Sequence, residues 1–297
     1  MATFISSVGF GLVTAGILAL GAVGFTLQFG LTNLFNLAYG ATMVLSAFFA
    51  YVLLHDVGLN PWVAMIGAGC AGATISVMAY VGLYRPFLRK GAGVFVLVMV
   101  SLAVFLILTY VTELIFGPRT YSMTFGLASE VRVGDLIWTE LQVVMMAIAV
   151  VGMALLHVVL RYTKNGKVLR ATANDQALAR FSGIDTRKVQ LAVWAVSGFL
   201  CGVCGVEFAL NAAVFNFSSN VTFLLLVFAA ATLGGVGEIY GAVVGAIIIG
   251  VATGLTAIVL PALQSVGALG LLLLVLLLRP RGLFGSSAAI DEDLGRY

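Results

Sequence analysis

The stretch MATFISSVGFGLVTAGILALGAVGFTLQFGLTNLFNLAYGATMVLSAFFAYVLLH, residues 1–55, contains no Asp, Glu, Lys or Arg. A helix that crosses a membrane needs about 20 mostly apolar residues, so this stretch has room for two. The rest of the chain is similar, because 62% of its 297 residues are hydrophobic and 9% are charged. Soluble domains have about 45–50% apolar and about 25% charged residues. The composition therefore excludes a soluble or disordered protein and predicts one that crosses a membrane many times.

Charge-poor windows of suitable length continue along the whole chain. We expect an all-α polytopic membrane protein with about nine transmembrane helices, within a range of roughly eight to ten. They are expected near residues 7–29, 36–54, 61–83, 94–115, 137–160, 189–213, 220–236, 241–260 and 264–278. The chain is expected to form a single transmembrane domain over residues 1–285, followed by a short cytoplasmic tail over 286–297.

The basic residues indicate which side of the membrane each loop occupies. Thirteen of the 15 Lys and Arg residues fall in three regions, 85–90, 161–188 and 279–296, which the nine-helix arrangement places on one side. Short loops rich in Lys and Arg stay in the cytoplasm. We therefore expect these regions and the C-terminus to be cytoplasmic and residue 1 to be outside. The net charge of +3 is small, and no nucleic-acid partner is expected.

Two segments interrupt the apolar windows with Gly and polar residues. GLTNLFNLAYG at 30–40 contains two Asn, and LGGVGEIYG at 233–241 contains four Gly and one Glu. Broken helices at membrane depth occur only where the backbone lies inside protein or beside a wet cavity. We expect broken helices at both places. Glycine there permits turns or close helix packing, which gives five candidate structural glycines: Gly40, Gly234, Gly235, Gly237 and Gly241.

The long cytoplasmic loop, 161–188, has the pattern of a short helix. Thr172 and Asp175 have the spacing of a capping box, and Gly183 is suited to end the helix, which is expected over 173–182. Ala177 and Leu178 are expected to share an apolar face with Phe181, because they lie four and three residues before it. This face either docks on a partner protein or rests on the lipid interface, and the residues alone leave both open.

The sequence lacks the motifs of nucleotide and metal chemistry. It contains no Gly-x-x-x-x-Gly-Lys-Ser/Thr phosphate loop and no His-Glu-x-x-His, so we expect no ATP hydrolysis, metal or cofactor in this chain. Cys201 and Cys204 have the spacing of a redox pair, but they lie in an expected transmembrane helix without basic neighbours, which favours a packing role. We therefore expect a transport protein rather than an enzyme.

Polar residues within the apolar windows are the candidates for a transport pathway. A carboxylate in a transmembrane helix usually faces a cavity or a partner, although Glu207 could instead reach the external surface. A secondary transporter acting alone needs ion-coupling groups inside its helices, and Glu207 is the strong candidate for that role. The pathway candidates are Asn33, Asn36, Tyr39 and Glu207.

Four segments, in order along nearly the whole chain, carry a family resemblance. GLTNLFNLAYG at 30–40, RATANDQALARFSGID at 170–185, LGGVGEIYGA at 233–242 and RPRGLFG at 279–285 resemble the conserved segments of one group of membrane permeases. The group is the LivH-like permease subunits of branched-chain amino acid ABC importers. The segments depart from the family pattern at Tyr39, where His is common, and at Ala41, where an acidic residue is common.

The resemblance implies an importer in the inner membrane of a bacterium or archaeon, surrounded by lipid. The expected cargo is a branched-chain or other hydrophobic amino acid, with urea, short amides or other amino acids as alternatives. The expected partners are a second permease subunit (LivM-like, or a second copy), two cytoplasmic ATPases that bind ATP and Mg, and a periplasmic or lipid-anchored substrate-binding protein. The loop helix then becomes a coupling helix, whose expected ATPase contacts are Ala173, Asn174, Asp175, Ala177, Leu178, Phe181, Gly183 and Ile184.

Overall fold

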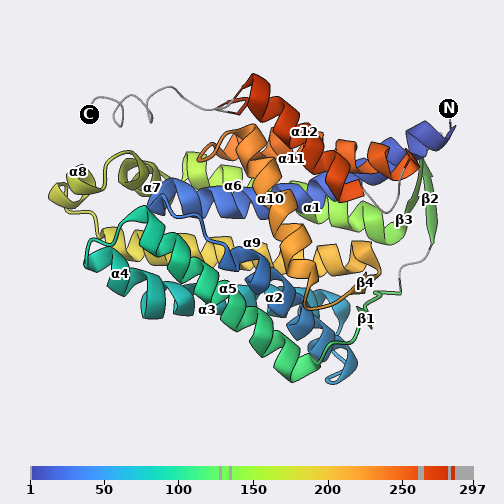
Figure 1. Ribbon diagram of the computed structural model, residues 1–297, viewed down its shortest axis with the longest axis horizontal. Helices are drawn as coiled ribbons and strands as arrows, with labels where there is room; N and C mark the ends of the chain where they lie inside the picture. Colours follow the sequence, from blue (N-terminus) through green and yellow to red (C-terminus); the bar gives the residue numbers. More distant parts are fainter. Residues whose placement is uncertain (1, 127–128, 134–135, 260–263, 280–281, 285–297) are drawn as a thin grey trace.

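The protein is a bundle of helices with two small strand ladders at one end (Figure 1). The computed structural model describes residues 2–126, 129–133, 136–259, 264–279 and 282–284. The expected tail, 286–297, lies outside the described residues, as do Arg281 and Arg296. The helices are α1 (Ala2–Thr32), α2 (Ala38–His55), α3 (Pro61–Ala79), the π-helical turn η1 (Tyr80–Tyr84), α4 (Arg85–Arg89), α5 (Val94–Phe116), α6 (Glu140–Tyr162), α7 (Lys164–Asn174), α8 (Gln176–Phe181), α9 (Thr186–Ala212), α10 (Ser219–Gly234), α11 (Ile239–Val259) and α12 (Gln264–Leu278).

The expected all-α membrane fold is confirmed, whereas the count of nine crossings is not. Within the described residues, seven helical segments are long and apolar enough to cross a membrane. They comprise α1, α2, α3 continued through η1 and α4, α5, α6, α9 and α11. The remaining two apolar helices, α10 and α12, have 16 and 15 residues. Both are shorter than the roughly 20 residues of a full crossing.

The two ends of the bundle differ in composition. The strands β1 (Tyr121–Ser122), β2 (Glu130–Val133), β3 (Leu136–Thr139) and β4 (Val214–Phe215) lie at one end, on the right in Figure 1. They pair antiparallel as β1–β4 and β2–β3. The helices α4, α7 and α8, which carry most of the basic loop residues, lie at the opposite end. We call this the cytoplasmic end, because positive charge stays inside.

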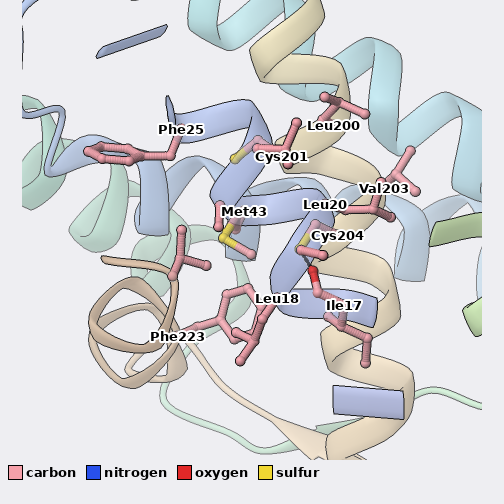
Figure 2. Close-up of a cluster of buried hydrophobic side chains, with 14 of the residues drawn as sticks. Ile17, Leu18, Leu20, Phe25, Met43, Leu200, Cys201, Val203, Cys204 and Phe223 are labelled. Atoms are coloured by element: carbon pink, nitrogen blue, oxygen red, sulfur yellow. Dashed lines mark hydrogen bonds between the residues drawn. The ribbon is translucent and has the colours of Figure 1, made fainter. Parts of the chain in front are cut away.

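α1 is the central helix of the bundle. It contacts α11 along much of its length and also packs on α9, α6 and α10. Figure 2 shows part of the core, where Ile17 and Leu18 of α1 meet Met43 of α2, Cys204 of α9 and Phe223 of α10. α5 and α6 are mostly exposed along their apolar length. Their outer faces are therefore available to lipid or to another subunit.

The first expected break brings the start of α2 inside the bundle. α1 ends at Thr32, Asn33 adopts a left-handed φ of 49°, and α2 begins at Ala38. The hydroxyl of Tyr39 donates a hydrogen bond to the carbonyl oxygen of Gly21, 3.0 Å away. Since Gly21 lies in the middle of α1, the N-terminus of α2 lies beside the middle of α1 and not at the cytoplasmic end.

The second expected break is a tight turn between α10 and α11. Gly235 and Gly237 have φ values of 108° and 95°, which side chains with a Cβ rarely adopt. Gly234 and Gly241 approach so closely that a Cβ on either would overlap the backbone of the other. Glycine at these four positions therefore lets the chain reverse while α10 and α11 stay in contact.

Candidate functional site

The cytoplasmic loop forms two helices instead of the single helix expected over 173–182. Thr172 lies inside α7, is buried, and donates its hydroxyl to the carbonyl oxygen of Val168 at 2.8 Å. The expectation that Thr172 caps the helix is therefore wrong, because its hydroxyl is already used within α7. The chain turns extended at Asp175, with φ −152° and ψ 107°, and α8 begins after it.

Asp175 is the residue that caps α8. Its Oδ1 accepts hydrogen bonds from the backbone amides of Ala177 and Leu178 at 2.8 and 2.9 Å. A carboxylate at this position also interacts favourably with the positive end of the helix. At the other end Gly183 has a φ of 80°, and the amide of Ile184 donates to the carbonyl oxygen of Ala179 at 3.0 Å. α8 is thus fixed at both ends despite having only six residues.

α8 presents apolar side chains to solvent. Phe181 is 91% exposed and Leu178 is 63% exposed, whereas Ala179 faces the bundle and is buried. Leu178 and Phe181 of the expected apolar face are thus exposed, and nothing within the described residues covers them. Ala177, which was expected on the same face, lines the cavity described next. Ala173 and Asn174, which were expected in the same helix, lie in the last turn of α7.

A cavity of about 1290 Å³ lies between α8, the last turn of α7, the N-terminus of α9, α4 and the end of α1. Leu178 and Phe181 do not line it, because they lie on the outer side of α8. The cavity thus brings most of the expected coupling residues together with Asn33, one of the pathway candidates. The expected coupling residues that line it are Ala173, Asn174, Asp175, Ala177, Gly183 and Ile184.

Asn36 joins three parts of the bundle. Its Oδ1 accepts hydrogen bonds from the Tyr84 hydroxyl at 2.8 Å and from the Ala38 amide at 3.1 Å. Its Nδ2 donates to Oε1 of Gln28 at 3.3 Å. Asn36 is 5% exposed, so water does not replace these bonds. The side chain therefore ties the N-terminus of α2 to α1 and to the π-helical turn.

Sequence reasoning missed the partners of Asn36. Tyr84 and Tyr80 both pack against Trp194 of α9, with ring centroids 5.0 Å apart in each pair. The π-helical turn at Tyr80–Tyr84 carries both tyrosines, and such turns are frequent at functional sites. The sequence signal for this cluster is the pair of tyrosines, Tyr80 and Tyr84, at the end of an apolar window. It does not point to Asn36, because Tyr84 and Asn36 are 48 residues apart.

Tyr39 and Glu207 are both buried within the chain. Tyr39 packs edge-on against Phe25, and its carbonyl oxygen accepts a hydrogen bond from the Cys201 thiol at 3.3 Å. Glu207 is 0% exposed, and neither carboxylate oxygen has a hydrogen-bond partner among the described residues. The alternative that Glu207 reaches the external surface is therefore wrong. Asn36, Tyr39 and Glu207 are not among the lining residues of the cavity that holds Asn33.

Residues 7–278 match the profile of the family described as branched-chain amino acid transport system, permease component. The chain belongs to this family. The match spans all the apolar helices, including both breaks and the cytoplasmic loop.

Individual relatives agree with the family over most of the chain. The high-affinity branched-chain amino acid transport system permease LivH of Salmonella typhimurium is 28% identical over 280 residues, covering 90% of this chain and 91% of the relative. The probable branched-chain amino acid transport permease LivH of Methanocaldococcus jannaschii is 27% identical, covering 92% and 90%. A solved structure, PsaBC from Streptococcus pneumoniae in complex with Fab, is similar with a TM-score of 0.50, 14% identity and 92% coverage of each chain. That likeness concerns the fold alone.

Membership of the family identifies the class of protein. The chain is a transmembrane permease subunit of an importer and a transport protein rather than an enzyme. The described part of the chain contains seven apolar helices long enough to cross a membrane, and the protein is a multi-pass inner-membrane protein.

Proposed function

We propose that this permease moves branched-chain or other hydrophobic amino acids through an ATP-driven importer, with α8 as the element that docks on a cytoplasmic ATPase. The observation that carries the docking proposal is the exposure of Phe181 and Leu178 on a rigidly capped helix at the cytoplasmic end. The two large apolar side chains lie close together on one short helix and offer an apolar surface to a partner protein. The cargo is supported by the relatives, which are named as branched-chain amino acid transport permeases.

The importer would contain several further chains. Because this sequence has no phosphate-binding loop, ATP and Mg would be bound by two partner ATPases. A second permease, LivM-like or a second copy, would complete the pathway, and the exposed faces of α5 and α6 offer area for it. A substrate-binding protein outside the membrane would deliver the amino acid.

α8 is suited to transmit motion because it is held to its neighbours. The guanidinium Nε of Arg180 donates to the Thr186 hydroxyl at 3.0 Å, which links α8 to the start of α9. Gln176 reaches α1, where its Nε2 lies 3.5 Å from the carbonyl oxygen of Leu31. A displacement of α8 by the ATPase would therefore move α9 and α1 together as a rigid-body change.

The pathway candidates have a more specific role in this proposal. Asn36 and Tyr39 would act by holding the start of α2 inside the bundle, where the backbone break would border the pathway formed with the second permease. Asn33 would sit at the cytoplasmic opening. Glu207 would act from within the core of this chain, because it has no exposed surface.

Docking is tested by co-purification of the assembled importer. Burying a phenylalanine contributes about 2 kcal/mol, so Phe181→Ala should weaken ATPase binding roughly 30-fold. Phe284→Ala is the matched control, because Phe284 lies outside α8 and its side chain is also exposed, at 55%. Transport and ATPase retention should fall with Phe181→Ala and stay normal with Phe284→Ala. Equal retention by both variants would refute the docking role of α8.

The cargo is tested separately in proteoliposomes that contain the complete importer and its binding protein. ATP-dependent uptake of labelled leucine, in preference to urea and acetamide, is the expected result. Preference for urea or acetamide would show that the cargo is a short amide and not a hydrophobic amino acid. Uptake by this chain alone, driven by a sodium or proton gradient, would instead show a secondary transporter.

A further inference from the structure

The wall of the cytoplasmic cavity carries an excess of positive charge. Four arginines line it, together with two aspartates: Arg85, Arg89, Arg180, Arg187, Asp175 and Asp185. Arg85 and Arg89 come from α4, and Arg187 comes from the first turn of α9. Arg85 lies near enough to Arg89 and to Arg187 for its charge to be repelled by each of them.

Both aspartates are already occupied by other groups. Asp175 accepts the amides at the start of α8, as described above. Oδ1 of Asp185 accepts the amides of Arg187 and Lys188 at 3.1 and 3.3 Å, and its other oxygen lies 3.6 Å from the Lys188 ammonium. Within the described ranges, none of the four arginines forms an ion pair. Four arginines against two aspartates leave the wall with a formal net charge of +2, so a negative group is still favoured there.

The cavity lies where an apolar helix leaves the membrane. The apolar segment Pro61–Arg89 ends with Arg85 and Arg89 in its last turns. The same segment exposes Val81, Leu83 and Phe87, which suit contact with lipid chains. Arginine side chains at such a boundary reach toward lipid headgroups.

We propose that this cavity binds a phosphate group, supplied by an anionic phospholipid of the cytoplasmic leaflet. Arg85, Arg89 and Arg187 would surround the phosphate, and the lipid chains would lie along the exposed apolar side of the segment. Guanidinium groups match phosphate oxygens in geometry and charge, and basic pockets at the cytoplasmic ends of membrane helices suit anionic headgroups. A bound headgroup would link α4 to the start of α9, next to the residues that hold α8.

The experiment measures lipid retention by the full chain. Native mass spectrometry of the detergent-solubilised protein, with equal amounts of dioleoylphosphatidylglycerol and dioleoylphosphatidylcholine, should show preferential binding of the anionic lipid. Each arginine near an anionic surface changes binding by about fivefold, so Arg85→Gln with Arg187→Gln should largely abolish the preference. Arg170→Gln is the matched control, because Arg170 is exposed on α7 and does not line the cavity.

The controls separate a site from a general effect of charge. The charge-conserving pair Arg85→Lys and Arg187→Lys should keep most of the preference. If the glutamine pair fails to fold, the single variant Arg89→Gln provides the same test, since Arg89 is exposed. An unchanged preference in the glutamine variants, or an equal loss in Arg170→Gln, would overturn the proposal.

Two further arms identify the source of the phosphate. Millimolar inorganic phosphate should neither displace the anionic lipid nor raise the unfolding temperature of the lipid-free protein. Displacement together with a higher unfolding temperature would show that the site takes a free anion and would overturn the lipid assignment. The lipid should also remain in the complete importer with its ATPases. Its loss there would show that the assembled importer does not hold the lipid and would overturn the proposal.

Discussion

Replacing Asn36 with leucine tests the claim that this side chain holds the start of α2 in place. Leucine has a similar size but can neither accept nor donate a hydrogen bond. Asn36→Leu would therefore remove the acceptor of the Tyr84 hydroxyl, the acceptor of the Ala38 amide and the donor to Gln28. Tyr84, Ala38 and Gln28 are all at most 2% exposed, so water cannot take over these bonds.

The magnitude follows from the number of polar groups left unpaired. A buried donor or acceptor without a partner costs about 1–3 kcal/mol, and leucine recovers roughly 1 kcal/mol by added apolar burial. With three groups left unpaired and about 1 kcal/mol recovered, Asn36→Leu should lower the free energy of unfolding by about 2–8 kcal/mol. Tyr84→Phe removes a single hydroxyl and leaves Asn36 bonded to Ala38, so it should cost about 1 kcal/mol.

The assay is thermal unfolding of the purified importer, with tryptophan fluorescence as the signal. Uptake is measured in parallel. Because Tyr84→Phe removes one of the unpaired groups, the double variant should be more stable than the sum of the two single changes implies. The control is Asn60→Leu, the same substitution at the exposed cap of α3, where Oδ1 accepts the Trp62 amide at 3.0 Å. Equal costs at Asn36 and Asn60, or strict additivity with Tyr84→Phe, would refute the reasoning.

Three further predictions concern close packing, pH and the buried carboxylate. A Cβ at Gly40 would lie 2.6 Å from a backbone oxygen of α10, so Gly40→Ala should destabilise the protein by about 1–3 kcal/mol, whereas Gly82→Ala, in open space, should not. The Lys188 amide donates to Asp185 and lowers the pKa of that carboxyl. The stabilisation by the ionised carboxyl is fully present above its pKa in the unfolded chain and is lost as pH falls through its lower pKa in the folded protein. The difference in unfolding temperature between wild type and Asp185→Asn should therefore vanish at low pH. Glu207→Gln should keep or raise the unfolding temperature, because an amide replaces an unpartnered buried carboxyl; a large decrease would show that the carboxylate has an essential partner.

The sequence predicted the class of fold and the places where the helices break. Both signals are local: an apolar window of about 20 residues defines a crossing, and a cluster of Gly or Asn marks an interruption. The cytoplasmic loop shows where this reasoning fails. Thr172 and Asp175 are both suitable caps, and the choice depends on whether the hydroxyl of Thr172 is free. It is not, because it is buried and bonded to Val168.

The sequence by itself determined that this protein is a multi-pass membrane permease with its basic loops on one side, since hydrophobicity, charge and motif order can be read along the chain. Only the tertiary structure decided that Tyr84 donates a hydrogen bond to Asn36 and that Glu207 has no exposed surface. It also gathered arginines from α4 and α9 around one cavity. The physical reason is that helix packing sets the distance between side chains that are far apart in sequence, and no periodicity within a single window specifies which helices pack together.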